Sequence, residues 1–231
     1  HGITVEIHPQ VATSLGEPGL PAGLPRMTTF DVTGKLNGGR CVLRLRTNLE
    51  VYWDQIFVAP LIERLESSSE GEPSRKSSEA LHVTTLEVSK ATLATRGCMS
   101  EASPDGKLPM LYDYDRLEAV PVTRMAGRLT RLGEVTELLQ EVDDRFAIFG
   151  PGDELTIQFD AKALPDLPTG WTRSFVLRTW GYCKDAGPFT LSGGTIEPLP
   201  FRGMKRYPYG PDERYPKDGR HDEYRRRYNT R

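Results

Sequence analysis

The stretch from Leu49 to Ala59 constrains the fold more than any other part of the sequence, because it is apolar on both faces of an extended chain. Successive side chains of a strand point to opposite faces of its sheet. The apolar residues here occupy both sets of positions: Leu49, Val51, Trp53 and Phe57 on one face, and Tyr52, Ile56 and Val58 on the other. A strand that is apolar on both faces belongs in the middle of a sheet. The stretch therefore predicts a central strand.

Other segments alternate with a period of two and predict further strands. In residues 40–47, Cys41, Leu43 and Leu45 point one way, whereas Arg44 and Arg46 point the other. The turn residues 37–39, Asn-Gly-Gly, precede this segment and favour a hairpin there. The remaining predicted strands are Ile3–Ile7, Thr29–Leu36, residues 81–95, Arg145–Phe149, Glu154–Asp160 and Arg173–Tyr182.

One segment has the spacing of a helix, and two others predict long loops. Gly133–Val142 places apolar residues on one helical face. Residues 64–79, rich in Ser, Glu and Lys, predict a mobile surface loop, and residues 97–131 predict a long irregular connection. No alternation of strands and helices is present. The sequence therefore predicts a mainly β fold, an antiparallel β-sandwich of jelly-roll type with one short helix and long loops.

The composition changes along the 231 residues predict three parts. Residues 1–28 are rich in Pro and Gly and predict an extended arm. Residues 29–200 carry most of the strand pattern and predict the β-sandwich domain. Residues 201–231 form a tail rich in Tyr, Arg and Pro, which we expect to pack on the domain or on a partner.

The distribution of charge along the chain indicates which kinds of binding partner the sequence favours. The formal net charge of the whole chain is −2, which favours neither nucleic acid nor a charged membrane surface. Residues 202–231 contain ten Lys or Arg and five Asp or Glu, a local net charge of +5. The interleaved acids weaken the case for nucleic acid. No apolar run approaches the roughly 20 residues of a membrane-spanning helix, so no membrane span is predicted.

The three cysteines, Cys41, Cys98 and Cys183, do not form a disulfide framework, because their number is odd and their spacing wide. No motif of a structural zinc site, a c-type haem attachment or a zinc protease is present. No glycine-flanked serine presents a hydrolase nucleophile either. The sequence therefore predicts no catalytic residues.

Several segments together resemble the C-terminal region of large bacterial proteins that carry FG-GAP propeller repeats with an ASPIC/UnbV-type domain, or tetratricopeptide repeats. The segments are 46–55 (RTNLEVYWDQ), 142–145 (VDDR), 150–154 (GPGDE), 170–173 (GWTR), 197–201 (EPLPF) and 228–231 (YNTR). The resemblance spans most of residues 20–231. It implies a terminal module of a larger multidomain protein, often an exported one, and hence an extracytoplasmic or secreted location. It implies no activity.

The aromatic residues are candidates for contacts with a ligand or partner. Trp53 and Asp54 are either a sugar-binding platform beside a carboxylate, or a core tryptophan next to an acid that bonds to a neighbouring turn. In the tail, Tyr and Arg together are typical of interface anchors. The full set of candidate contact residues is Trp53, Asp54, Trp171, Trp180, Tyr207, Tyr209, Tyr215, Arg225 and Tyr228.

Two acidic groups are candidates for calcium, which prefers carboxylate oxygens. They are Asp113 with Asp115 in the long connection, and Asp143 with Asp144 after the predicted helix. Turn chemistry alone also explains Asp residues at these places. A b-type haem held by a Met and a Lys is an alternative cofactor, as in some β-sandwich electron-transfer subunits, although no spacing selects a pair. No cofactor is predicted outright.

These observations predict a non-catalytic binding or assembly module, whose partners are other domains of a parent protein or subunits of a complex. Two alternatives stay open. One is an electron-transfer β-sandwich subunit with b-type haem, and the other is a carbohydrate-binding β-sandwich that uses Trp53, Trp171 or Trp180.

Overall fold

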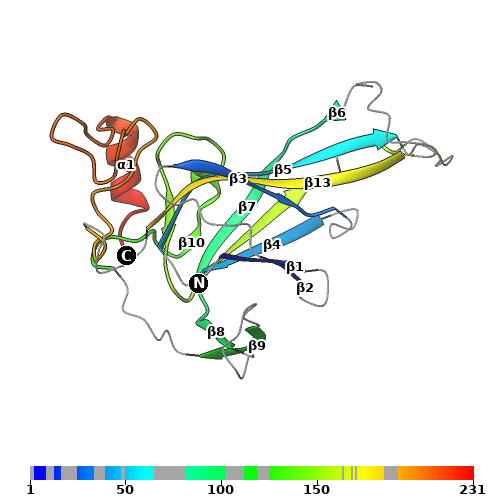
Figure 1. Cartoon of the computed structure of the whole chain (residues 1–231), viewed down its shortest axis with the longest axis horizontal. Helices are drawn as coiled ribbons and strands as arrows, with labels where there is room; N and C mark the ends of the chain where they lie inside the picture. Colours follow the sequence, from blue (N-terminus) through cyan, green and yellow to red (C-terminus); the bar gives the residue numbers. More distant parts are fainter. Residues whose placement is uncertain are drawn as a thin grey trace, which may run out of the picture.

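The computed structural model of the chain describes residues 3–8, 13–16, 25–33, 40–47, 50–64, 82–101, 112–118, 125–162, 164–167, 169, 171–184 and 192–231. These residues form a mainly β fold in which an antiparallel sheet curls into a half-barrel, with one α-helix at the C-terminal end (Figure 1). The mainly β, antiparallel, sandwich-like class predicted from the sequence is confirmed.

The strands of the main sheet follow the order β2-β1-β4-β12-β7-β5-β13-β3, and all neighbouring strands are antiparallel. Their bounds are Ile3–His8 (β1), Thr13–Gly16 (β2), Arg26–Asp31 (β3), Arg40–Thr47 (β4), Glu50–Arg64 (β5), Leu86–Thr95 (β7), Asp153–Asp160 (β12) and Trp171–Lys184 (β13). Three short strands also pair with strands of this sheet: His82–Val83 (β6) and Ala147–Phe149 (β11) with β5, and Gly133–Glu134 (β10) with β7.

The central strand predicted from residues 49–59 is β5. It pairs with β13 along one edge, and with β11, β7 and β6 in succession along the other. Tyr52 and Trp53 point to opposite faces, and both are buried, with relative exposures of 0% and 1%. Both faces of β5 are therefore covered, as the apolar pattern predicts.

The bend of the half-barrel lies at β7. Leu86 and Glu87 pair with β5, whereas the strand from Val88 onward pairs with β12. One strand thus belongs to two parts of the sheet. This change of partner brings the inner faces of the two parts together around one core, whose largest buried side chains include Trp53, Tyr52, Phe146, Phe149 and Phe159.

The prediction of a helix at Gly133–Val142 is wrong. Residues 133–134 form β10, and only Thr136–Leu138 form a short 3-10 turn (η1). The backbone N–H of Val135 donates to Ala91 O, and the Thr136 hydroxyl oxygen accepts from Ala91 N. The segment therefore bonds to β7, and within itself it forms the bonds of a 3-10 turn, from Leu138 N to Val135 O and from Leu139 N to Thr136 O. Its apolar residues Val135, Leu138 and Leu139 are buried as expected.

The N-terminal arm contributes more strands than predicted. The strand expected at Ile3–Ile7 is present as β1, and β2 follows it. In β1, Val5 lies opposite Leu45 and Ile7 opposite Leu43, so the apolar side of the arm continues that of β4. The charged loop predicted at 64–79 lies outside the described residues except for Arg64.

The connection 97–131 contains a separate antiparallel pair, Cys98–Glu101 (β8) and Tyr112–Glu118 (β9). Cys98 is half-buried and Cys183 is buried, while the side chain of Cys41 is outside the described part. A search for membrane spans among the described residues finds no helix with the necessary length and hydropathy.

Candidate functional site

The predicted tail folds back onto the sheet, and residues 201–231 are called the C-terminal cap below. Its α-helix, α1, spans Gly219–Arg227. Asp218 caps the helix, because its carboxylate accepts the backbone N–H of His221 at 3.0 Å. Arg225, Arg226 and Arg227 occupy the last turn, where positive charge interacts favourably with the helix dipole.

Three side chains of the cap bond to one short backbone segment, residues 143–146. The Tyr215 hydroxyl donates to Asp144 O, and the Tyr224 hydroxyl donates to Phe146 O at 2.8 Å. A ring nitrogen of His221, Nε2, lies 3.0 Å from Asp143 O. The cap is therefore fixed to the loop between η1 and β11 by polar contacts through buried or half-buried side chains.

Asp54 of β5 lies beneath this loop and holds it from the other side. Its two carboxylate oxygens accept the backbone N–H groups of Asp143 and Asp144, each at 3.1 Å. The side chain is fully buried. Burial raises the pKa of Asp54 to about 8, since the cost of desolvating the charge outweighs the two N–H donors.

The end of the cap is fixed at a second place. Leu129 N donates to Arg231 O at 2.8 Å, and Arg231 N donates back to Leu129 O at 3.1 Å. Arg131 N donates to Tyr228 O at 2.7 Å. The guanidinium of Arg231 also forms a two-point contact with Asp153, the first residue of β12. Backbone and side chain together close the cap onto the sheet.

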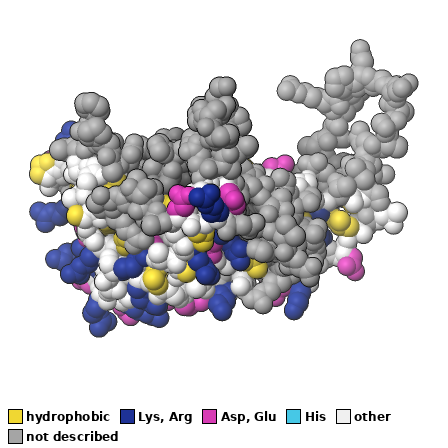
Figure 2. Space-filling view, turned by 90° about the horizontal axis from the view of Figure 1, so that it is seen from below, with side chains coloured by type: hydrophobic (Ala, Val, Ile, Leu, Met, Phe, Trp, Pro, Cys, Tyr) yellow, Lys and Arg dark blue, Asp and Glu magenta, His cyan; other side chains and the backbone are white. Residues whose placement is uncertain are grey.

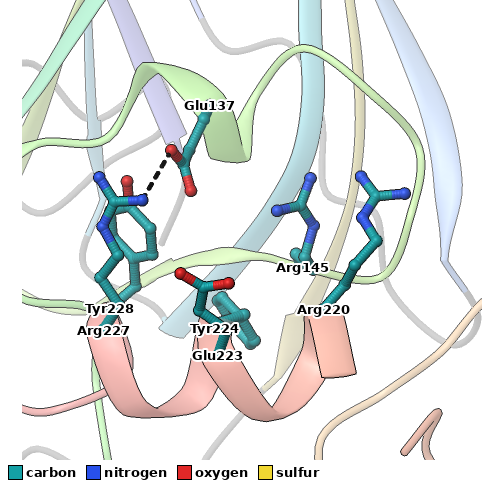
Figure 3. A pocket seen from close by; sticks show the side chains of 7 residues that line it. All are labelled: Glu137, Arg145, Arg220, Glu223, Tyr224, Arg227 and Tyr228. Carbon is teal, nitrogen blue, oxygen red and sulfur yellow. Dashed lines mark hydrogen bonds and ion pairs between the residues drawn. The ribbon is translucent and has the colours of Figure 1, made fainter. Parts of the chain in front are cut away.

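A pocket lies between α1 and the loop that the cap contacts (Figure 3). Its volume is about 150 Å³, and its lining residues are Glu137, Arg145, Arg220, Glu223, Tyr224, Arg227 and Tyr228. In Figure 3 the guanidinium groups of Arg145 and Arg220 lie side by side, while Glu137 and Arg227 face each other on the opposite side. Arg227 Nη1 lies 3.3 Å from a Glu137 carboxylate oxygen.

The pocket is lined by charged side chains and phenol groups. Arg145 and Arg220 both pair with Asp143, at 2.6 Å and 3.3 Å. Burial raises the pKa of Tyr224, so its hydroxyl stays protonated and serves as a donor. None of the seven lining residues is a Ser, Cys, Lys or His that a neighbouring base could activate.

The predicted contact residues do not form one surface. Trp53 lies in the core and Asp54 bonds to a neighbouring turn, which is the second of the two roles considered for this pair. Trp171 and Trp180 are half-buried, the first at the start of β13 and the second within it. Since Trp53 is 1% exposed, its ring has no free face for a sugar.

The tyrosines of the tail point toward the domain instead of toward solvent. The Tyr207 hydroxyl accepts from Lys184 Nζ at 2.6 Å and donates to Pro198 O at 2.7 Å. Tyr209 packs edge-to-face on Phe201. Tyr228 is buried, and the guanidinium groups of two arginines lie over its ring. Of the candidate contact residues in the tail, only Arg225 is exposed.

The two acidic pairs lie in different places. Asp143 and Asp144 are next to Asp54, and each has a partner, because Asp143 pairs with Arg145 and Asp144 accepts the backbone N–H of Arg202. Asp113 is exposed on β9, and the side chain of Asp115 is not described. Within the described ranges, no group of three or more His, Cys, Asp or Glu is arranged to hold a metal ion.

The residues considered for a b-type haem are already engaged where the structure describes them. Met125 and Met204 are buried among the core side chains. Lys184 is buried, and its ammonium group donates to Tyr207 and to Thr195 O. Lys90 is exposed on β7. No Met–Lys pair with a shared cavity emerges from these positions.

One cluster was not anticipated from the sequence. Arg44 and Arg46 of β4 and Arg96 after β7 converge on the carboxylate of Glu154, which is 2% exposed. The alternation in β4 already placed Arg44 and Arg46 on one face. The convergence depends on the pairing of β12 with β4 and β7, which no local pattern gives.

Comparisons of the chain with protein-family models, with curated proteins and with solved structures gave no match.

Proposed function

We propose that this chain is a non-catalytic binding and assembly module, and that the C-terminal cap is its contact surface. The observation that carries the proposal is the arrangement of side chains within the cap: its tyrosines are buried or half-buried, and its basic side chains, except Arg231, are exposed. Tyr215 and Tyr224 bond to the backbone of the domain, whereas Arg225 and Arg226 are exposed on α1. A cap built in this way presents charge on a fixed backbone.

The charge of the cap supports a partner that is acidic. Residues 202–231 have a net charge of +5 in a chain whose total is −2, so residues 1–201 carry −7. Lys and Arg side chains gather at the end of the molecule where α1 lies (Figures 1 and 2). Complementary charge mainly raises the rate of association and the specificity for a partner, and contributes less to affinity. The proposed partner is an acidic surface of another domain or subunit.

The resemblance to the C-terminal region of FG-GAP and tetratricopeptide-repeat proteins is part of this proposal and is in keeping with a module of a larger assembly. Neither carbohydrate binding nor haem binding has an observation of comparable weight in its favour, because Trp53 is buried and Lys184 is engaged.

The test is native mass spectrometry of the protein purified from its source at low ionic strength, followed by the same measurement at high salt. We expect the chain to be found bound to a second polypeptide, or to another part of a longer one, and the complex to weaken as salt rises. The double variant Arg225→Glu/Arg226→Glu should lose the complex. Lys162→Glu reverses an exposed charge on another face and should keep it.

A complex that survives Arg225→Glu/Arg226→Glu unchanged would contradict the cap as the contact surface. A chain that carries haem or another bound group by mass would replace the proposal with a cofactor-binding function.

A further inference from the structure

The face of the sheet opposite the core carries three arginines around one carboxylate. Leu43 and Leu45 of β4 are buried, so Arg44 and Arg46 project from the other face. In the sheet register, Glu154 lies directly opposite Arg46 on one side. Arg96 follows the end of β7, and its backbone N–H is fixed to Gly152 O at 2.8 Å. The cluster therefore draws on three parts of the sheet.

Only one of the three arginines is hydrogen-bonded to Glu154. Arg46 approaches one carboxylate oxygen with Nε and Nη2, both at 2.8 Å. Arg44 and Arg96 reach the other oxygen with Nε at 3.7 Å and 3.5 Å. These two distances exceed the range of an N–H···O hydrogen bond, which ends near 3.2 Å. The attraction of Arg44 and Arg96 to Glu154 is thus electrostatic only.

The cluster has an excess of positive charge. Among the described side chains, one carboxylate faces three guanidinium groups. The adjacent acid, Asp153, is matched by Arg231. Like charges so close together repel, and an anion that binds among them removes this repulsion.

Unused donors point to where an anion would bind. Arg44 Nε is shielded from solvent and has no hydrogen-bond partner among the described residues. A buried donor without a partner is unfavourable, because it has lost its hydrogen bonds to water. The side chains of Arg44 and Arg96 are 27% and 57% exposed, so a ligand reaches them from solvent. Both Nε atoms lie near one Glu154 oxygen, at 3.7 Å and 3.5 Å, and are therefore at most 7.2 Å apart. One oxyanion can contact both guanidinium groups across such a gap.

We propose that Arg44 and Arg96 form a binding site for an oxyanion, the carboxylate or phosphate group of a ligand. Arg46 and Glu154 act as the positioning pair that holds the site open. Guanidinium groups match the oxygens of carboxylates and phosphates through two parallel N–H donors, which is why arginine serves such sites. None of these residues belongs to the C-terminal cap, so the proposed oxyanion site does not depend on the proposed function. A test that refutes one of the two proposals leaves the other unaffected.

The test is an NMR titration at low ionic strength that follows the Nε–H signals of the arginines. Inorganic phosphate and acetate are the two probes, and tighter binding of one identifies the group that the site prefers. We expect a saturable shift of the Arg44 Nε–H signal. We also expect at least a tenfold weaker dissociation constant in each of Arg44→Gln and Arg96→Gln, measured from shifting backbone amides of β12.

The matched control is Arg225→Gln, which removes the same charge from an exposed position on α1 and should bind as the wild type does. Both test variants keep the Arg46–Glu154 pair, and their thermal midpoints report whether the fold is kept. A shift that does not saturate with either probe would overturn the proposal. Equal weakening in Arg225→Gln and Arg44→Gln would overturn it too, since that result indicates general screening of charge.

Discussion

Arg231 and Asp153 form a two-point ion pair in which Nη1 lies 2.9 Å from Oδ1 and Nη2 lies 2.6 Å from Oδ2. The Asp153 side chain is fully buried, and it also accepts from the Thr95 hydroxyl and from Gly150 N. Burial alone would raise the pKa of Asp153, but its bonds to Arg231 outweigh this effect and lower the pKa. The pair joins the end of the cap to the first residue of β12.

Removal of this pair should destabilise the fold. Arg231→Ala leaves a buried carboxylate without its counter-charge, and such a loss costs about 3 kcal/mol in other proteins. We expect the urea midpoint to fall clearly in Arg231→Ala. Arg226→Ala removes an exposed arginine of α1 and should stay within about 0.5 kcal/mol of the wild type. Equal stability of the two variants would mean that the pair does not hold the cap.

The same pair predicts acid sensitivity. Because the folded pKa of Asp153 lies below the ordinary value of 3.8, the contribution of the pair to stability is present above that value and is lost as pH falls through the lower folded pKa. Arg231→Ala should therefore lose less stability than the wild type when both are brought to acid. Chemical unfolding at a series of acidic pH values measures the difference.

Asp54 predicts the opposite trend at higher pH. Its folded pKa is about 8 and the ordinary pKa of an Asp side chain is 3.8, so the folded state binds more protons than the unfolded state between these two values. The free energy of unfolding must then fall as pH rises through this window, by up to about 1.4 kcal/mol per pH unit. In Asp54→Asn, which cannot ionise, the fall between about pH 5 and about pH 8 should be smaller. Equal slopes in the two proteins would show that Asp54 is ionised in the folded state.

Tyr224 tests whether polar contacts hold α1 on the domain. Its hydroxyl donates to Phe146 O at 2.8 Å within a buried environment. Tyr224→Phe removes this donor and leaves the carbonyl without it, at a cost of about 1 kcal/mol. The control is Tyr182→Phe, because the Tyr182 hydroxyl makes no hydrogen bond within the described ranges. Hydrogen exchange of α1 amides should accelerate in Tyr224→Phe and stay unchanged in the control.

The strands were predictable because their signal is local. In β4 and β12 the alternation of apolar and polar residues reflects one face on the core, and the burial of Leu43, Leu45, Leu155 and Ile157 follows it. The double-faced pattern of β5 likewise required no knowledge of its partners. A period of two is a property of the strand itself, so it survives in the sequence whatever the topology.

The helix was predicted in the wrong segment because tertiary contacts determine the structure both of residues 133–142 and of α1. Residues 133–142 have a helical spacing, but Ala91 of β7 bonds to the backbone N–H of Val135 and to the side-chain hydroxyl of Thr136. In α1, charged residues dominate the sequence, and only His221 and Tyr224 face inward from within the helix. Its apolar face is too narrow to give a periodic signal. Its stability comes from capping by Asp218 and from bonds to a distant loop, neither of which is visible in local periodicity.

The cap and the arginine cluster depended on pairing that is remote in the sequence. Asp54 and Asp143 are 89 residues apart, and Arg46 and Glu154 are 108 apart. The sequence could indicate that Tyr and Arg of the tail contact something, but not that the tyrosines and Arg231 contact the domain while the other arginines are exposed.

Gly181 gives the sharpest test of the core around β5. A Cβ at this position would lie 2.6 Å from Trp53 Cε3 and 2.6 Å from Tyr52 O, closer than real Cβ atoms come. The strands β5 and β13 would have to separate where the register already shifts, between Trp180 and Gly181. Overpacking of this kind costs typically 1–3 kcal/mol, and the backbone contact places Gly181→Ala at the upper end of that range.

Gly219→Ala is the matched control for this substitution. Gly219 is the first residue of α1, and no atom lies within 4 Å of a Cβ built there. Alanine forms helix more readily than glycine, so this variant should be as stable as the wild type or more stable by at most about 1 kcal/mol. Urea unfolding of the two variants should therefore move in different directions from the same chemical change. A Gly181→Ala protein as stable as the wild type would mean that Trp53 has room to move, and the close packing of β5 on β13 would be refuted.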